Sequence, residues 1–450
     1  MKIAIIGAGP AGLTFAALMK RQDPHHEITL YERGPRSATW GFGVVFSDRA
    51  LEFLRADDED LYQYLTPHME TWPHLTIQVN DTRIPITGNG FSATGRLELL
   101  TLLYAYVERL GVRIEFEREI TSLDPLQDAD LIVGANGAFS WVRTENEAAF
   151  GTTIDWRPNR FIWYGTSQVF DSLSLTFRDT PHGVFCAHHY RYSPPVSRRA
   201  APKANGTAAR QGEGVPSPVS TFLVEVEDAT WQRAGFETMS PQDTIRHCEQ
   251  VFAPDLGGHP ILSNNSYWRQ FPAIWNDRWS MGKVVLMGDA LRTAHFSVGS
   301  GTRLAMEDAV ALAKAFREHG SDVPAALADH AATGLPTLAG LRDSFPDVAR
   351  AALEAALRAD MGESWAERVG SFLRNQTGAR SLTPREGTDP DAILSRAEAA
   401  VQTGDLATAL QELAAMPEAA QPALADWRAL AETRRQGEDA ARALAARPSE

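Results

Sequence analysis

A glycine-rich hexapeptide near the amino end of the chain has the composition of a dinucleotide-binding turn. Residues 7–12 read GAGPAG, follow an apolar run and precede a segment with helical spacing. In such a turn the first glycine permits a tight bend, the second lets the backbone approach a pyrophosphate, and the third allows close packing of helix on strand. We assign these roles to Gly7, Gly9 and Gly12. Glu32 follows at about the 20-residue distance at which a carboxylate binds an adenosine ribose. The alternative is an ordinary tight turn.

A second glycine-rich segment favours FAD over NAD. Asp289 ends an apolar strand, where its carboxylate could accept hydrogen bonds from ribityl hydroxyls. Gly299 and Gly301 then open a helix, and such a turn presents backbone N–H groups where a reduced isoalloxazine carries negative charge. The chain has one dinucleotide fingerprint, so we expect NADH or NADPH to bind transiently, without a domain of its own.

Two histidines are candidates for proton transfer. His188, Tyr190 and Tyr192 alternate along a predicted strand, so they share one face, and we expect one face of this strand to line a substrate cavity. A histidine there could remove a ring or phenol proton near neutral pH. His295 lies just before the glycine turn at Gly299 and Gly301, and it is a second candidate for the same proton transfer. For both, a hydrogen-bonded core histidine is an equally good interpretation.

The elements that must position these residues follow an interrupted α/β pattern. Strand and helix signals alternate in two outer parts of the first 324 residues, whereas β-branched and aromatic residues dominate the part between them. We therefore predict an α/β fold, a Rossmann-like FAD-binding domain with an inserted, mostly antiparallel β-sheet substrate domain. The FAD domain would take about 1–70, 95–155 and 276–324, and the substrate domain about 71–94 and 156–275.

Two segments depart from this pattern. Residues 197–218 are rich in Ala, Pro, Gly and Ser and lack periodicity, which predicts a disordered loop. Residues 325–450 are rich in Ala, Glu, Leu and Arg with helical spacing, which predicts an all-helical C-terminal module.

Composition excludes several classes of protein. The net charge of −14 argues against a nucleic-acid partner, which would need clustered Lys and Arg. Cys186 and Cys248 are the only cysteines, so we expect neither a disulfide framework nor a metal site. No apolar run approaches the length of a membrane span, which is about 20 residues. We expect a cytoplasmic protein without a membrane span.

Four separate stretches carry a resemblance to a known family. They are residues 40–48 (WGFGVVFSD), 159–166 (NRFIWYGT), 187–192 (AHHYRY) and 293–302 (TAHFSVGSGT). Because of these four stretches, residues 1–325 resemble the FAD-dependent aromatic hydroxylases. The resemblance is strongest to the monooxygenase half of the salicylyl-CoA 5-hydroxylase and 2-aminobenzoyl-CoA monooxygenase group.

This resemblance implies an activity. Reduced FAD and O₂ would form a flavin hydroperoxide, which an electron-rich ring attacks. The ring would belong to an aryl-CoA such as salicylyl-CoA or 2-aminobenzoyl-CoA, and NAD(P)H would be the reductant. The resemblance also implies that Arg96 contacts the flavin side of the cofactor, against the alternative of a solvated arginine at a helix start. Hydroxylation of a tryptophan derivative, as in violacein synthesis, stays open. So does assembly as a homodimer.

The chain also departs from the family. Asn136-Gly137 stands where the family usually has Asp-Gly, which keeps an acceptor oxygen but removes a charge. From about residue 325 the sequence resembles the C-terminal helical region of bacterial mitofilin-like proteins instead, so the chain looks like a fusion. A third interpretation is therefore a non-catalytic fusion that acts as a binding or scaffold protein.

Overall fold

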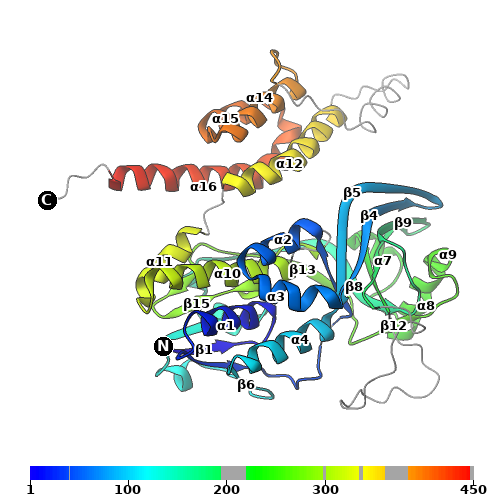
Figure 1. The fold of residues 1–450 in the computed structure, drawn as a ribbon. Coiled ribbons are helices and arrows are strands. Elements are labelled where there is room, and N and C mark those ends of the chain that lie inside the picture. Colours follow the sequence, from blue (N-terminus) through cyan, green and yellow to red (C-terminus); the bar gives the residue numbers. More distant parts are fainter. Residues whose placement is uncertain (40, 194–218, 297–300, 334–337, 360–383, 446–450) are drawn as a thin grey trace, which may run out of the picture. The chain divides into compact units, whose positions relative to one another are not determined.

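The computed structural model describes residues 1–39, 41–193, 219–296, 301–333, 338–359 and 384–445. The predicted loop 197–218 and the candidate cofactor residue Gly299 lie outside these ranges. The chain divides into two compact units, Met1–Ala328 and Asp329–Glu450 (Figure 1). None of the helices in the described ranges combines the length and the apolar character that a membrane crossing needs.

A six-stranded sheet organises one half of the first unit. Its strands run parallel, except that β14 and β15 are antiparallel. In spatial order they are β14 (Ser280–Met281), β15 (Val284–Leu286), β7 (Leu131–Gly134), β1 (Lys2–Ile6), β2 (Glu27–Tyr31) and β6 (Arg113–Glu115). The central strands are continuous apolar runs because parallel strands are covered on both faces. The predicted Rossmann-like fold is confirmed.

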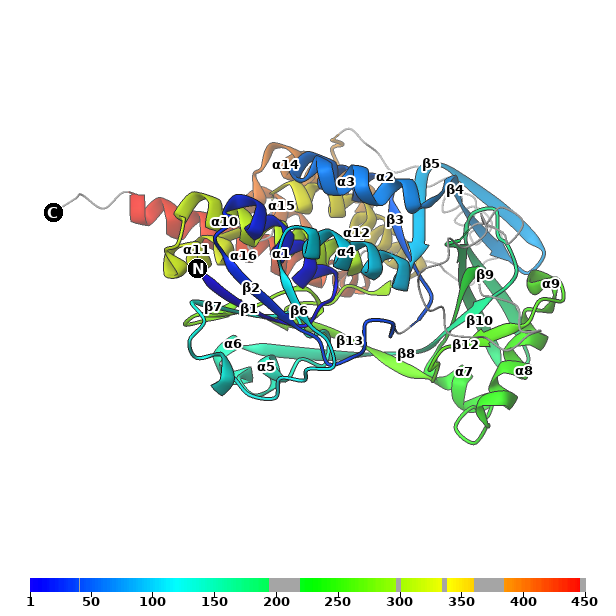
Figure 2. The ribbon, with the colours of Figure 1, turned by 60° about the horizontal axis from the view of Figure 1, so that its bottom comes forward.

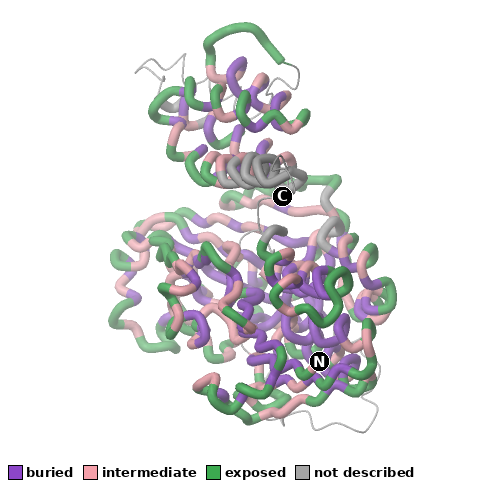
Figure 3. Tube along the Cα trace, turned by 90° about the vertical axis from the view of Figure 1, so that its left-hand side faces the viewer, coloured by how far each residue is buried: buried purple, intermediate pink, exposed green. Residues whose placement is uncertain are grey.

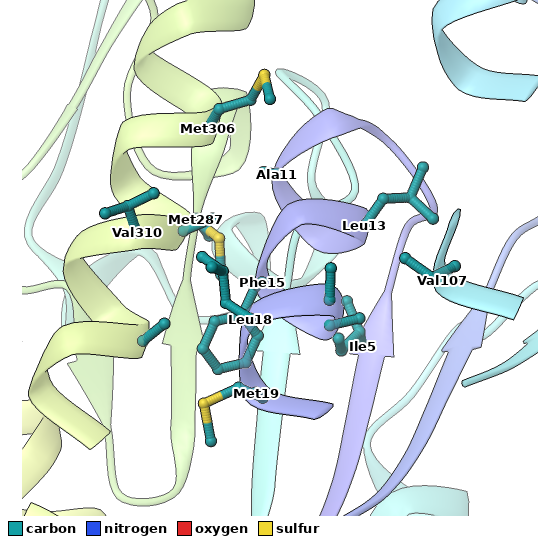
Figure 4. Packing of buried hydrophobic residues seen from close by; sticks show 14 of the residues in the cluster. Ile5, Ala11, Leu13, Phe15, Leu18, Met19, Val107, Met287, Met306 and Val310 are labelled. Carbon is teal, nitrogen blue, oxygen red and sulfur yellow. The ribbon is translucent and has the colours of Figure 1, made fainter. Parts of the chain in front are cut away.

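Helix α1 (Pro10–Gln22) is the element that connects the glycine turn to the core. It begins with a proline, whose missing N–H is not needed in the first turn. The helix packs between the sheet and α10 (Gly301–His319), and the rings of Phe15 and Phe316 lie 6.3 Å apart. Figure 4 shows Phe15 on the side of α10, and Leu13 beside Val107 of α4 (Arg96–Arg109).

The remaining helices around this sheet are shorter. They are α2 (Asp48–Asp57), α3 (Glu59–Leu65), α5 (Trp141–Thr144), α6 (Glu147–Phe150) and α11 (Val323–Thr333), with 3₁₀ turns at Thr66–His68, Asp124–Leu126 and Gly288–Ala290. Helix α11 contributes Ala326 and Leu327 to the same hydrophobic core as Val310 and Phe316 of α10. The apolar face of α10 is therefore covered within the first unit.

A nine-stranded sheet forms the second half of this unit. All its pairings are antiparallel except that of β4 with β9. In spatial order the strands are β12 (Ile261–Ser263), β8 (Thr152–Thr166), β11 (Ser220–Val226), β10 (Gly183–Arg191), β9 (Leu173–Thr180), β4 (Glu70–Val79), β5 (Thr82–Gly95) and β3 (Gly43–Ser47), and β13 (Arg269–Asn276) also pairs with β8. This is the predicted antiparallel insertion.

Strands β8 and β13 link the two sheets, because they extend from the corner near α5 and α6 to the nine-stranded sheet (Figure 2). Strand β3, which the sequence analysis assigned to the FAD domain, pairs with β5 in the nine-stranded sheet. Three short helices that the sequence analysis did not specify cover part of this sheet: α7 (Asp228–Arg233), α8 (Pro241–Val251) and α9 (Ala253–Leu256).

The described part of the second unit is helical, as predicted. It contains α12 (Leu338–Ala359), α14 (Pro390–Thr403), α15 (Leu406–Ala414), a 3₁₀ turn (Glu418–Ala420) and α16 (Gln421–Ala445). Trp427 anchors its core, since its indole N–H donates to the Leu341 carbonyl at 3.1 Å and its ring meets Phe345 edge-on. Figure 3 shows buried residues gathered inside each unit, so each has a core of its own.

Candidate active site

The first glycine turn has the geometry that its sequence predicts. Gly7 has a φ of 105°, and a Cβ placed there would lie 2.4 Å from the Ala135 carbonyl oxygen. A Cβ at Gly12 would lie 2.5 Å from the Gly7 oxygen. At Gly9, in contrast, a Cβ would meet nothing within 4 Å. Gly7 and Gly12 are therefore required by the fold, whereas Gly9 borders open space at the N-terminus of α1, where a phosphate could approach.

Glu32 lies directly beside this turn. Its carboxylate accepts hydrogen bonds from the backbone N–H of Ala8 at 3.1 Å and of Gly34 at 2.8 Å. The side chain is half-buried, so part of it stays open to a ligand. Asn136 also borders the turn, and its buried Oδ1 has no hydrogen-bond partner among the described residues. Polar acceptors thus surround the place where the sequence predicts the adenosine half of FAD.

The second glycine-rich segment starts with a short turn, Gly288–Ala290, which packs against the start of α1. A Cβ at Gly288 would lie 3.1 Å from the Cβ of Ala11 and 3.3 Å from that of Ala305, so only glycine permits this approach. Asp308 of α10 accepts the Gly288 backbone N–H at 3.2 Å and pairs with Arg292. The first glycine turn and the turn at Gly288–Ala290, distant in sequence, therefore lie close together beyond the carboxyl ends of β1 and β15.

A cavity of about 220 Å³ lies between Asp289 of the second segment and the nine-stranded sheet. One wall is a single face of three neighbouring strands, because residues that alternate along a strand share a face. The side chains on this wall are Phe161 and Trp163 of β8, His188 and Tyr190 of β10, and Thr221 and Leu223 of β11. The lining is mostly apolar with a few polar groups, which is typical of small-molecule sites.

Arg96 and Asp289 bring charge to the opposite side of the cavity. Arg96 makes no side-chain hydrogen bond or ion pair with any residue that the structure describes. Burial lowers the pKa of its guanidinium, and Asp289 partly opposes this shift. Burial likewise raises the pKa of Asp289, against the effect of Arg96. Asp289 is nevertheless exposed and Arg96 only half-buried, so both side chains stay open to a polar ligand.

The resemblance stretches meet at this cavity. The hydroxyl of Tyr190 donates to the Gly43 carbonyl at 2.9 Å, and the Gly43 N–H donates to Thr221 Oγ1 at 3.0 Å. A Cβ at Gly43 would lie 2.5 Å from the ring of Tyr192, and one at Gly165 would lie equally close to Phe42. Residues from three stretches thus pack together as the sequence pattern requires.

The structure separates the candidate histidines. His188 lines the cavity, and its Nε2 lies 3.1 Å from Glu225 Oε2. His295 lines a neighbouring groove of about 540 Å³ instead, with its Nε2 3.9 Å from Glu225 Oε1. His189 points to the other face of the sheet, between Phe170 and Phe222, where burial lowers its pKa to about 3. The predicted alternation of this strand is confirmed.

Sequence reasoning missed Glu225 and Asn159. Asn159 Nδ2 donates to Glu225 Oε1 at 2.8 Å, so the carboxylate is held from two strands. A charged residue within the otherwise uncharged strand STFLVEV was the available signal, since buried carboxylates are rare unless they are paired.

Comparison with known proteins identifies the family. The FAD binding domain family matches residues 1–331. The chain belongs to the FAD-dependent aromatic hydroxylases. It is 38% identical to salicyloyl-CoA 5-hydroxylase from a Streptomyces species, over 83% of this chain and 67% of that one. Residues 1–324 make up less than 83% of this chain, so the match extends beyond residue 324.

Two further relatives are named for other substrates. The chain is 36% identical to 3-hydroxy-4-methyl-anthranilyl-[aryl-carrier protein] 5-monooxygenase from Streptosporangium sibiricum, over 70% of this chain and 79% of that one. It is 33% identical to protodeoxyviolaceinate monooxygenase from Chromobacterium violaceum, over 89% of this chain and 100% of that one. The mitofilin-like character of the region after residue 325 stays a prediction.

A solved structure supports the fold independently. A crystallised 2-methyl-3-hydroxypyridine-5-carboxylic acid oxygenase matches with a TM-score of 0.58 at 18% identity, over 88% of this chain and 96% of that one. The protein is therefore an FAD-dependent aromatic monooxygenase by family, and it shares the fold of this solved structure.

Proposed function

We propose that this protein hydroxylates the aromatic ring of an aryl-CoA thioester, with FAD as cofactor, O₂ as oxygen source and NADH or NADPH as reductant. The observation that carries the proposal is the mostly apolar cavity lined by an imidazole, a guanidinium and the carboxylate of Asp289, whose own turn packs against the first glycine turn. The relatives named for salicyloyl-CoA and for an anthranilyl group on a carrier protein support this substrate class.

The adenosine and pyrophosphate of FAD would be bound at the first turn. The residues proposed for this are Gly7, Gly9, Gly12 and Glu32. The open space at Gly9 and the free N–H groups at the start of α1 suit a pyrophosphate, whose charge the helix N-terminus stabilises. The Glu32 carboxylate would accept hydrogen bonds from the ribose hydroxyls.

The flavin half would be bound at the second turn. Asp289 would accept hydrogen bonds from the ribityl chain, and Gly301 would border the ring at the N-terminus of α10. Arg96 supplies a cation on the same side of the cavity. Gly299 keeps its proposed role on the sequence alone.

The bound flavin supplies the activated oxygen, so the chain must exclude water and hold the ring in place. Phe161, Trp163 and Phe296 would do both, because they form apolar walls of the cavity. The ring reacts as a nucleophile. An amino substituent activates it through its lone pair, and a hydroxyl substituent activates it more strongly once it gives up its proton. His188 is the base we propose for that proton, and His295, in the groove, stays a second candidate.

Parallel turnover assays test this proposal. FAD-loaded protein would be given salicyloyl-CoA, 2-aminobenzoyl-CoA or a tryptophan derivative, each with NADH and with NADPH. Mass spectrometry of the product and a peroxide assay separate hydroxylation from unproductive oxidation of the reductant. We expect hydroxylated thioester. Hydroxylation of the tryptophan derivative alone would contradict the proposed substrate class.

That second substrate class has its own support. The match to protodeoxyviolaceinate monooxygenase covers the whole of that protein, which favours a substrate without a CoA group. The scaffold interpretation has a simpler test, because a purified protein that is colourless and takes up no added FAD would favour it over both enzymatic proposals.

A further inference from the structure

Glu225 is a buried carboxylate that the proposed function does not use. It is the only charged residue of β11, and 9% of it is exposed. The strand register places it opposite Cys186, and it places His188 opposite Leu223. Glu225 and His188 are therefore diagonal neighbours on one sheet face. A buried carboxylate destabilises a fold unless hydrogen bonds satisfy it, so its contacts indicate what it does.

The contacts keep Glu225 ionised. Its Oε1 accepts from Asn159 at 2.8 Å, and its Oε2 lies 3.1 Å from His188 Nε2. Burial alone would raise the pKa of Glu225, but the bonds from His188 and Asn159 outweigh it and hold that pKa below the ordinary value. Two more titratable groups face this carboxylate. They are His295, whose pKa burial lowers, and the Cys186 thiol, whose pKa burial raises.

An ionised carboxylate fixes the hydrogen on the imidazole. Because it can only accept, Nε2 of His188 must carry the hydrogen, and in the neutral ring Nδ1 then carries the lone pair. The Cys186 sulfur, 3.6 Å from the same Nε2, is only a weak acceptor and does not compete. Nδ1 of His188 has no hydrogen-bond partner in the part of the chain that the structure describes.

The carboxylate stands outside the cavity. His188 lines both the cavity and the groove, whereas Glu225 lines the groove alone. A substrate in the cavity would therefore contact His188 without touching Glu225. This arrangement leaves Glu225 free to act through the imidazole.

We infer that Glu225 is a positioning residue for His188, which keeps Nδ1 as the base and stabilises the imidazolium once it forms. This inference rests on the proposed function. In the step concerned, the O–H bond of the ring's hydroxyl substituent breaks and a bond from Nδ1 to that hydrogen forms. The electron pair stays on the substrate, and the positive charge on His188 is balanced by Glu225.

The variant Glu225→Gln tests this role. Asn159 still donates to the remaining oxygen, so the amide N–H₂ group faces His188 Nε2 and donates to it. The ring hydrogen then moves to Nδ1, which loses its lone pair. General base catalysis contributes roughly 10²- to 10⁴-fold, so we expect kcat with salicyloyl-CoA to fall at least tenfold at neutral pH. KM and the Kd for FAD should change by less than about twofold, a split expected when only the transition state loses an interaction.

Two measurements distinguish a positioning role of Glu225 from a purely structural one. First, the variant should recover toward the wild-type rate at a pH high enough to ionise the phenol without a base. Second, adding Glu225→Gln to His188→Gln should cost no further activity, because residues that act as a unit are not additive. Glu70→Gln is the matched control. Glu70 pairs with Arg191 in the same sheet and lines neither cavity nor groove, so kcat should stay within about twofold.

The outcomes are distinguishable. If Glu225→Gln binds no FAD, Glu225→Asp replaces it, since it keeps the charge but is too short to hold His188, and it should show the same recovery at high pH. A Glu225 variant as fast as the wild type, or one with a uniform loss at every pH, overturns the inference alone. A wild-type protein that hydroxylates no aryl-CoA refutes the proposed function, and this inference with it, whereas one that hydroxylates 2-aminobenzoyl-CoA but no phenol overturns the inference alone.

Discussion

Replacement of Gly9 by alanine separates cofactor binding from folding. Gly9 has φ −84° and ψ 179°, which alanine adopts without strain, and the added Cβ would meet nothing within 4 Å. Two small effects on the free energy of unfolding oppose each other. Replacing glycine at a compatible position stabilises by about 0.4–1 kcal/mol through the unfolded chain. Alanine at a helix N-cap costs a similar amount, about 0.5–1 kcal/mol relative to glycine.

The apoprotein should therefore keep its stability, within about 0.5 kcal/mol, which is roughly 2 °C in Tm. FAD binding should not survive unchanged, because the methyl group occupies the space into which the pyrophosphate must come. Overpacking of this size costs roughly 1–3 kcal/mol. At about 1.4 kcal/mol per factor of ten, the Kd for FAD should rise roughly 5- to 150-fold.

Thermal unfolding of the apoprotein and fluorescence titration with FAD measure both quantities on one preparation. Gly12→Ala is the contrasting variant, since its Cβ would lie 2.5 Å from the Gly7 oxygen and 3.0 Å from Ile5 Cγ2. It should lower the apoprotein Tm directly. A Gly9→Ala protein with the wild-type Kd for FAD would show that the pyrophosphate does not lie on this turn.

Three further outcomes are expected. Burial lowers the pKa of His189 from 6.5 to about 3, so between these pH values the folded protein keeps it neutral while the unfolded chain binds a proton. The contribution of His189 to stability is therefore fully present above pH 6.5. It is lost as the pH falls toward 3, by at most about 1.4 kcal/mol per pH unit. Urea unfolding of His189→Phe should show a flatter dependence in that window, and an unchanged slope would contradict the shift. A chain ending after Thr333 keeps the core residues of α11 and should retain its FAD content and solubility; loss of either would show that the second unit supports the first. Arg96→Met keeps the packing but removes the cation, and we expect the FAD Kd measured by titration to rise about tenfold; no change would favour a solvated arginine.

Local sequence was enough for the parts of the site that local rules determine. GAGPAG follows a strand and opens a helix, and Gly7 and Gly12 each have a steric reason to be there, so the turn and Glu32 could be placed from sequence. Alternation along residues 187–192 likewise placed His188 and His189 on opposite faces of one strand. These features depend on bonds between near neighbours in the chain.

The pairing of strands that are distant in the chain could not be predicted from the sequence. Strand β3 joins the antiparallel sheet by pairing with β5, about 50 residues away, and nothing in GVVFS specifies that partner. The contact of Glu225 with His188 depends on the register between β10 and β11. The position of His295 in the groove was equally hidden, because its neighbours Ala294 and Phe296 line the cavity. Register and loop path set these positions.

The origin of the product oxygen tests the central claim most directly. FAD-loaded protein would turn over salicyloyl-CoA under isotopically heavy O₂ in ordinary water, and the product would be analysed by mass spectrometry. We predict a hydroxylated thioester that carries one heavy oxygen atom on its ring. A product whose new oxygen comes from water, or reductant consumption that yields only peroxide, would contradict the account.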